Sequence, residues 1–323
     1  MTSDYDPLAS VQAAGPPGTI SFVYGLPDTA TFPLKDLERA TVRVLRERPE
    51  LALQYGPEQG YGPLIDWVRE KLAREENLQV PRARMMITGG SSQALDHVCT
   101  LFTRPGDLVL VEAPTYHESV QLFRDHGLGP VQIPTDGDGL LVDALARRLE
   151  LLARRGERAR LLYVIPNFQN PSGITLDAGR RPAVLELAAR YDLLVLEDDV
   201  YRDLAYEGEV PASLFALDTG RRAERVLRIG SFSKILAPGL RMGWLMGPEG
   251  LIESLIQGGL RCMGGGANPL VANILADYCR QGLMEPHIQE LRTVYRERRD
   301  VTLAALEAYM PPGVGWTRPA GGY

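Results

Sequence analysis

The sequence predicts an α/β fold whose core is a mainly parallel sheet of seven strands with helices on both faces. Between about residue 60 and residue 260, short runs of β-branched or apolar residues alternate with longer helical patterns, which favours parallel strands joined by helices. Leu193–Leu196 is continuously apolar, as a strand covered on both faces should be. Acidic residues 197–199 come directly after it, at the strand end where α/β folds bind ligands.

Strands are expected where short apolar runs occur, and helices where apolar residues recur every three or four positions. The expected strands are Met85–Thr88, Leu108–Glu112, Gly129–Ile133, Leu161–Ile165, Leu193–Asp198, Val226–Gly230 and Met242–Gly247. The expected helices between them are Pro63–Glu76, Ser92–Leu101, Tyr116–His126, Val142–Arg155, Gly179–Tyr191 and Leu251–Cys262. Leu283 to Met310 should form one long amphipathic helix, and residues 1–33, rich in Gly and Pro, an extended arm.

The composition is that of a soluble globular protein and argues against several functions. The 323 residues are 45% hydrophobic and 24% charged, with a net charge of −6, whereas a nucleic-acid-binding protein would need a basic face. No stretch of about 18 apolar residues is present to span a membrane, and the N-terminus lacks the features of a signal peptide. The three cysteines form no CxxC pair, so we expect no metal site, no disulfide and a cytoplasmic location.

Lys234 lies in a turn rich in Gly, Ser and Pro that begins at Gly230 and contains Arg241. Of 35 lysines and arginines only three are lysines, so a lysine kept in such a turn is expected to do something that arginine cannot. Only lysine forms an imine with an aldehyde, while hydroxyls and a planar guanidinium bind phosphate. Pyridoxal phosphate requires both functions in one place. The alternative is a surface lysine in a loop.

Two further segments are suited to the phosphate and the ring of such a cofactor. Thr88–Ser92 follows an expected strand and opens an expected helix, and free N–H groups at a helix N-terminus bind phosphate. An ordinary serine N-cap explains this segment equally well. Tyr116 follows the next strand and could stack on a flat heterocycle, although packing is the simpler explanation of an isolated tyrosine.

Three more segments carry polar side chains that the same cofactor requires. Asn170, in a loop after a strand, could donate to a phenolic oxygen, or it belongs to a turn built with Asn and Pro. Asp198 could keep a pyridine nitrogen protonated, so that the ring becomes an electron sink, and Tyr201 could reach the phenolic oxygen. A solvated acidic turn is the alternative for Asp198. Tyr55 lies in a Gln-Tyr-Gly-Pro segment that, taken alone, is an ordinary turn.

In this order the segments resemble the class I/II aminotransferases, which are pyridoxal-phosphate enzymes of fold type I. The resemblance runs from about Ile20 to Tyr323. It is closest to the branch that contains 2-aminoadipate and aromatic aminotransferases and the cofactor domain of MocR-type regulators. It implies that Lys234 is the Schiff-base lysine and proton-transfer catalyst, that Asp198 pairs with the pyridine nitrogen, and that Tyr201 holds the phenolic oxygen.

The same resemblance implies the remaining contacts. Tyr116 would stack on the ring, and Asn170 would hold the phenolic oxygen beside the substrate. Gly25 and Tyr24 would also lie beside the substrate, with Tyr24 narrowing its pocket. Tyr55 would reach the phosphate of a neighbouring subunit, which implies a homodimer with shared active sites. The phosphate would be bound by Gly90, Ser91, Ser92, Ser231, Ser233 and Arg241.

Three regions are expected from the resemblance. Residues 1–45 would form an N-terminal arm and part of a small domain, residues 46–280 the large cofactor-binding domain, and residues 281–323 the start of the C-terminal small domain. Relatives continue beyond the Gly-Gly-Tyr motif that ends this sequence, so we expect the small domain to be incomplete. The arginine that binds the substrate's α-carboxylate in relatives has no counterpart assigned here.

We therefore expect transamination, in which an amino group moves from an amino acid of the 2-aminoadipate, aromatic or branched apolar type to a 2-oxo acid. A C–S lyase or decarboxylase of the same fold would use the same cofactor. A non-catalytic domain that senses pyridoxal phosphate, as in MocR regulators, is a third interpretation. The acidic charge and the absence of a DNA-binding segment before residue 20 weigh against it.

Overall fold

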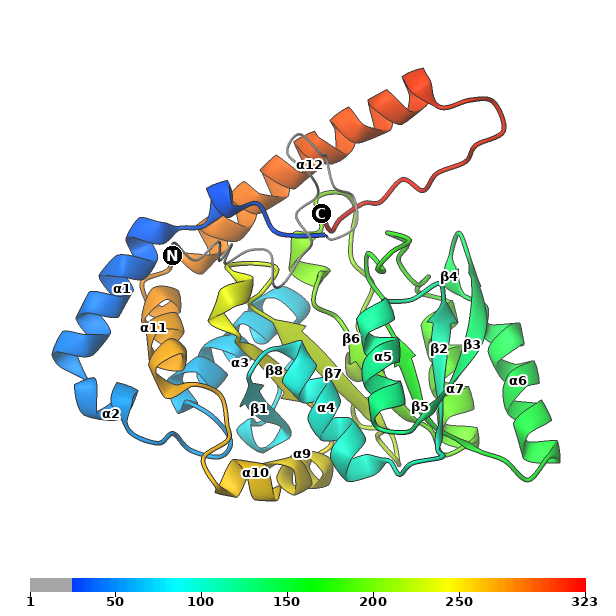
Figure 1. The fold of residues 1–323 in the computed structure, drawn as a ribbon, viewed down its shortest axis with the longest axis horizontal. Coiled ribbons are helices and arrows are strands. Elements are labelled where there is room, and N and C mark those ends of the chain that lie inside the picture. The colour runs from blue at the N-terminus through cyan, green and yellow to red at the C-terminus, as the bar shows by residue number, and fades with distance from the viewer. Residues whose placement is uncertain (1–24) are drawn as a thin grey trace, which may run out of the picture.

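The computed structural model describes residues 25–323, so the expected contact of Tyr24 with substrate lies outside the described residues. Its centre is one mixed sheet with the strand order β1-β8-β7-β6-β5-β2-β3-β4 (Figure 1). The strands are β1 (Met85–Thr88), β2 (Leu108–Ala113), β3 (Gly129–Asp136), β4 (Gly139–Leu140), β5 (Ala159–Val164), β6 (Leu194–Asp198), β7 (Val226–Ser231) and β8 (Gly243–Met246).

All seven expected strands are present, with ends that differ by a few residues. The expected number is wrong by one, because β4 adds a strand that pairs antiparallel with the end of β3. Two residues are too few to show a periodicity in the sequence. The five strands β3, β2, β5, β6 and β7 are parallel, whereas β8 lies antiparallel between β1 and β7. The prediction of a mainly parallel sheet is therefore confirmed.

Helices cover both faces of the sheet, as predicted. Side chains alternate along a strand, so Val109 and Leu110 of β2 belong to two different hydrophobic clusters. The Val109 cluster includes residues of three helices, α4 (Ser91–Phe102), α5 (His117–Asp125) and α9 (Glu249–Ile256). The Leu110 cluster includes residues of α3 (Gly62–Glu76), α6 (Val142–Arg154), α7 (Arg180–Arg190) and α8 (Leu214–Asp218).

Further helices pack beside the sheet. The helices α1 (Leu34–Glu47) and α2 (Pro49–Leu53) contact α11 (Pro269–Arg280), and none of these three was predicted. The long amphipathic helix is confirmed as α12 (Met284–Tyr309). The helix expected at 251–262 is instead two, α9 and α10 (Gly259–Cys262), because the backbone is extended at Gly258. Most of the expected extended arm falls before residue 25, outside the described residues.

After α12 the chain returns to the carboxyl ends of the parallel strands (Figure 1). Gly321 forms an isolated β-bridge with Ala205, and Ala320 accepts a hydrogen bond from the Tyr206 backbone N–H at 3.1 Å. These contacts join the last residues to the short 3-10 helix η3 (Arg202–Leu204), which follows β6. The remaining 3-10 helices are η1 (Thr29–Thr31), η2 (Arg82–Arg84) and η4 (Pro238–Leu240). In the described part of the chain, no helix has the length and apolarity needed to cross a membrane.

Candidate active site

Lys234 lies in the loop between β7 and β8, at the carboxyl end of β7. Phe232 anchors this loop, since its N–H donates to the carbonyl of Met242 at 3.0 Å. The Lys234 amine donates to the Tyr323 hydroxyl at 2.7 Å. Burial lowers the pKa of Lys234; Arg241 also lowers it, while Asp198 opposes the change. The amine therefore loses its proton more readily than an exposed lysine would, as a proton acceptor requires.

Asp198 ends β6 and is buried, with 5% of its surface exposed. The Tyr163 hydroxyl donates to its Oδ2 at 2.7 Å, whereas Oδ1 has no hydrogen-bond partner among the described residues. Burial raises the pKa of Asp198 from 3.8 to about 6, although the hydrogen bond from Tyr163 opposes the rise. A buried carboxylate with one open oxygen is suited to bind a cationic group.

Three more of the expected residues lie near Asp198 and Lys234. The Lys234 amine is 5.7 Å from the centroid of the Tyr201 ring. Burial raises the pKa of Tyr201 to about 12, and a hydrogen bond with the Asn170 side chain opposes this rise. Burial also raises the pKa of the Tyr116 hydroxyl, and the negative charge of Asp198 adds a little to this rise. The structure thus brings together side chains that are far apart in the sequence.

The N-terminus of α4 faces Arg241. Gly90 caps the helix with a φ of +84°, and Ser91 and Ser92 are the first residues of its first turn. Arg241 Nη2 lies 3.5 Å from both Ser92 Oγ and Gly89 O. A Cβ on Gly90 would come within 2.8 Å of the same nitrogen. Glycine at position 90 therefore leaves room for the guanidinium beside the free N–H groups of the helix, a combination suited to bind an anion.

Ser231 and Ser233 lie in the same loop as Lys234. Ser231 Oγ accepts a hydrogen bond from the Ser233 backbone N–H at 3.0 Å, and both residues are buried. Within residues 25–323, neither side chain is hydrogen bonded to Arg241. The structure therefore places them near the lysine and leaves their contact with phosphate a prediction.

Gly25 and Tyr55 lie at the margins of this group. The Gly25 carbonyl accepts from the Tyr323 hydroxyl at 2.9 Å, so it is linked to Lys234 through that hydroxyl. Tyr55 is 80% exposed and lies against Gly264, since a Cβ on that glycine would be 2.7 Å from Tyr55 Cδ1. Its expected role concerns a neighbouring subunit and stays a prediction.

Two residues that contact the site were not predicted, Tyr163 and Tyr323. Tyr163 lies inside β5, and the signal that could have found it is a hydroxyl in an otherwise apolar strand, which needs a partner when buried. Tyr323 reaches Lys234 from 89 positions away in the sequence. No local pattern signals a contact of that range.

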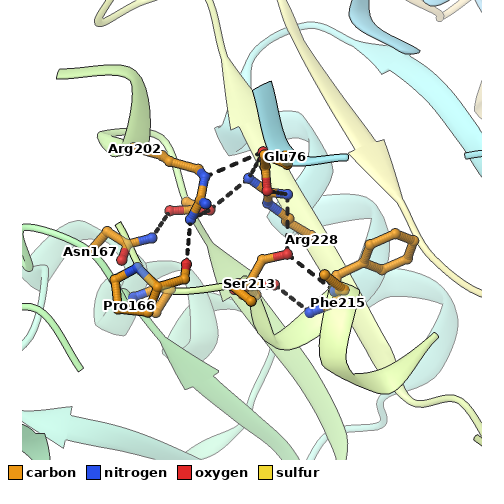
Figure 2. A network of polar contacts seen from close by, with 12 residues as sticks. Glu76, Pro166, Asn167, Arg202, Ser213, Phe215 and Arg228 are labelled. Atoms are coloured by element: carbon orange, nitrogen blue, oxygen red, sulfur yellow. Dashed lines mark hydrogen bonds and ion pairs between the residues drawn. The ribbon is translucent and has the colours of Figure 1, made fainter. Parts of the chain in front are cut away.

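A buried ionic network holds the end of β6 in place (Figure 2). Arg228 of β7 binds Glu76 of α3 with both terminal nitrogens, at 2.9 and 2.8 Å, and pairs with Asp199 at 2.8 Å. Asn167 donates to Asp199 from the loop after β5. Because Asp199 directly follows Asp198, this network fixes the neighbouring carboxylate and the loop after β5 relative to each other.

These residues fit pyridoxal phosphate. The open oxygen of Asp198 suits a protonated pyridine nitrogen, the α4 N-terminus with Arg241 suits a phosphate, and the Lys234 amine suits an aldehyde. Between residues 25 and 323, no group of three or more His, Cys, Asp or Glu side chains is arranged to hold a metal ion.

Several known proteins are similar to this chain in sequence and fold. The family model described as aminotransferase class I and II matches residues 24–323. Aromatic-amino-acid aminotransferase 1 of Thermococcus litoralis is 39% identical over 307 residues, covering 94% of this chain and 72% of that protein. The crystal structure of Pyrococcus horikoshii kynurenine aminotransferase has a TM-score of 0.87 and 39% identity, over 93% of this chain and 73% of that one.

A second crystal structure shows a cofactor derivative in a similar protein. The α-aminoadipate aminotransferase of Thermus thermophilus, complexed with N-(5′-phosphopyridoxyl)-L-leucine, has a TM-score of 0.83 and 36% identity, over 93% of this chain and 74% of that one. The family match covers nearly all of the chain. The chain therefore belongs to the class I and II aminotransferases of fold type I, with pyridoxal phosphate as its cofactor and transamination as its activity.

Proposed function

We propose that this aminotransferase acts through Lys234, taking the amino group from an aromatic, 2-aminoadipate or branched apolar amino acid and passing it to a 2-oxo acid. The observation that carries the proposal is the position of one half-buried amine beside Asp198 and Tyr201, at the carboxyl ends of neighbouring strands. The relatives named for aromatic amino acids, kynurenine and α-aminoadipate support this range of donors.

The residues that would hold the cofactor follow from their chemistry. The open oxygen of Asp198 would accept from the pyridine nitrogen, and Tyr201 with Asn170 would bind the phenolic oxygen. Tyr116 would cover the ring. The phosphate would be bound by Gly90, Ser91, Ser92, Ser231, Ser233 and Arg241. When bound, pyridoxal phosphate supplies an electron-withdrawing ring that weakens the bond between the substrate's α-carbon and its hydrogen.

Lys234 would move the proton. Burial lowers the pKa of its amine, which favours the neutral form that can accept a proton. Nζ would take up the proton from the substrate's α-carbon and deliver it to the cofactor carbon that is bonded to the same nitrogen. Asp198 stays ionised beside a cation, because a positive partner favours the charged form. The rings of Tyr201 and Tyr323 pack against each other beside the amine, with centroids 5.7 and 5.3 Å from Nζ, and limit the access of water on that side.

The substrate side of the site would include Gly25 and Asn170, with Tyr24 as a further contact. Gly25 O lies within hydrogen-bond reach of the Tyr323 hydroxyl that also meets Lys234, which places this carbonyl near the reacting groups. The tyrosine rings around the amine offer an apolar, aromatic surface, and such a surface suits a donor with an aromatic or long side chain.

A homodimer with shared sites would complete the phosphate site through Tyr55. The exposed apolar residues near Tyr55 support this partner, because large apolar side chains gathered on one surface indicate an interface. These are Leu51 at 59%, Leu53 at 67%, Leu260 at 57% and Met263 at 83% exposed. Tyr55→Phe is expected to weaken cofactor binding about tenfold without changing the dimer, as measured by spectroscopic titration and analytical ultracentrifugation.

The regional organisation and location are proposed on the same basis. Residues 46–280 would form the large cofactor-binding domain, residues 1–45 an arm with part of a small domain, and residues 281–323 the start of the C-terminal small domain. All three cysteines are free, which supports a reducing compartment, the cytoplasm.

Substitution of Lys234 by alanine tests the proposal directly. The variant is expected to lose transamination and the visible absorbance of lysine-bound cofactor, whereas Lys35→Ala, at an exposed position, should keep both. Unchanged activity and spectrum in Lys234→Ala would refute the role of this lysine. Release of ammonia or a thiol from the amino acid without a 2-oxo acid acceptor would instead favour the lyase interpretation.

A further inference from the structure

One phenol joins Lys234 to the N-terminal part of the described chain. The Tyr323 hydroxyl accepts a hydrogen bond from Lys234 Nζ at 2.7 Å and donates one to the carbonyl of Gly25 at 2.9 Å. Its ring packs against Tyr201 and Tyr295, with centroids 5.9 and 5.4 Å apart. Neither the family's expected contacts nor the proposed cofactor contacts give Tyr323 a role.

The two hydrogen bonds fix which group donates. A hydroxyl has one proton, and the proton of Tyr323 is directed at a carbonyl oxygen that can only accept. The hydroxyl oxygen must therefore accept from Lys234. In the neutral amine, one N–H bond then points at Tyr323, so the lone pair of Nζ points elsewhere and stays free to take up a proton.

Tyr323 is held in this position by its backbone. The Gly322 N–H donates to the Leu204 carbonyl at 3.1 Å. Leu204 ends the short 3-10 helix η3, which Tyr201 caps at its N-terminus. Gly322 has a φ of +85°, and a Cβ on Gly321 would come within 2.4 Å of the Phe168 ring. The two glycines therefore let the chain lie close to the turn that carries Tyr201, and this places the phenol over the lysine.

We propose that Tyr323 is a positioning residue that holds the free amine of Lys234 and directs its lone pair during the part of the reaction in which the lysine is not bound to the cofactor. The proposal rests on the proposed role of Lys234. Among the described residues, Tyr323 is the side chain hydrogen bonded to Nζ. Asp198, Glu118 and Arg241 act on the amine through their charge.

The hydrogen bond has a measurable consequence for Lys234. An acceptor stabilises the ammonium form more than the neutral amine, because hydrogen bonds from charged donors are stronger. Tyr323→Phe keeps the ring and removes the acceptor. The pH at which half of the amine is deprotonated should fall by about half to one unit. Tyr295→Phe is the matched control, since Tyr295 contacts the same ring but forms no hydrogen bond with Lys234 among the described residues.

Competitive labelling of amines with acetic anhydride over a pH series measures this midpoint without any need for turnover. The chain has only three lysines, and they can be followed separately by mass spectrometry of peptides cut at arginine. Lys35 is exposed and serves as an internal reference. The full chain is labelled free of cofactor and, in parallel, loaded with pyridoxamine phosphate, in which the lysine amine is also free. A separate sample with pyridoxal phosphate is reduced with borohydride to find which lysine carries the cofactor.

The outcomes separate the two proposals. The inference predicts a lower midpoint for Lys234 in Tyr323→Phe, with Tyr295→Phe and the Lys35 reference unchanged. The same midpoint in wild type and Tyr323→Phe would overturn it, provided that reduction attaches the cofactor to Lys234. An equal fall in both tyrosine variants would also overturn it, because packing and not the hydroxyl would be responsible. Cofactor found on another lysine would overturn the proposed function, and the inference with it.

Discussion

Replacement of Asp198 by asparagine is expected to stabilise the cofactor-free protein while removing its activity. Burial raises the pKa of this carboxyl from 3.8 to about 6, so the folded state binds the proton more tightly than the unfolded state. The stability that this proton contributes is complete below pH 3.8 and is lost as the pH rises through about 6. The shift of about 2 units corresponds to about 3 kcal/mol. Asparagine does not titrate and can still accept from Tyr163, so the variant avoids the loss.

Urea unfolding of the cofactor-free proteins, followed by circular dichroism, measures the effect. The expected gain of Asp198→Asn over wild type is about 1.5 kcal/mol near pH 5 and about 3 kcal/mol near pH 8. Asp125→Asn, which can keep its hydrogen bond with Gln121, controls for the loss of one exposed carboxylate. Addition of pyridoxal phosphate should stabilise the wild type more than the variant. An equal gain at both pH values, or a loss near pH 8, would refute the reasoning, because the buried carboxylate would then not be disfavoured.

Three other substitutions test separate parts of the site. Tyr163→Phe removes the donor to Asp198 and should raise the pKa of that carboxyl by about one further unit, seen as a higher midpoint in the pH dependence of cofactor binding. Gly90→Ala should weaken cofactor binding more than about tenfold, because its Cβ would clash with the guanidinium beside it. Gly106→Ala, at a φ of +95° in open space, carries the backbone strain alone and should leave that affinity unchanged. Arg228→Met removes the nearer cationic partner of the largely buried carboxylates of Glu76 and Asp199 and leaves them with Arg202, at 3.3 and 3.9 Å. The free energy of unfolding should fall by about 3 kcal/mol. Unchanged stability would show that the network is not needed.

That the expected site residues lie close together could be predicted because of where parallel strands end. Asn170 and Asp198 follow neighbouring strands, and Lys234 follows the next, so a parallel sheet brings the three to one edge whatever their distance in the sequence. The alternative of a solvated acidic turn at Asp198 is wrong, because residues 197–199 are all buried. Burial is a tertiary property, and the run of three acidic residues by itself favours the surface.

Several helices and one contact were not predicted from the sequence, for different reasons. Helix α11 begins with an Asn268 cap followed by Pro269, a start signal that the sequence does contain. Helix α1 has an amphipathic pattern of its own, but it directly follows the Gly- and Pro-rich segment, whose composition indicates irregular structure. The interruption between α9 and α10 comes at Gly258, where glycine permits either continuation or a break. The contact between Tyr323 and Lys234 depends on the whole path of α12 and its return, and local patterns do not contain that path.

The three acidic residues at the end of β6 explain how one carboxylate is kept available. Glu197 accepts from the backbone N–H groups of Leu214 and Phe215, at 2.8 and 2.9 Å. Asp199 pairs with Arg228. Asp198, between them, accepts one hydrogen bond, from the Tyr163 hydroxyl to Oδ2, and its Oδ1 has no hydrogen-bond partner among the described residues. The Tyr163 hydrogen bond and the charge of Lys234 offset only part of the cost of burying this carboxylate, so a cation bound at Oδ1 would lower that cost further. A protonated pyridine nitrogen would be such a cation, and the carboxylate would in turn favour the protonated form of that nitrogen.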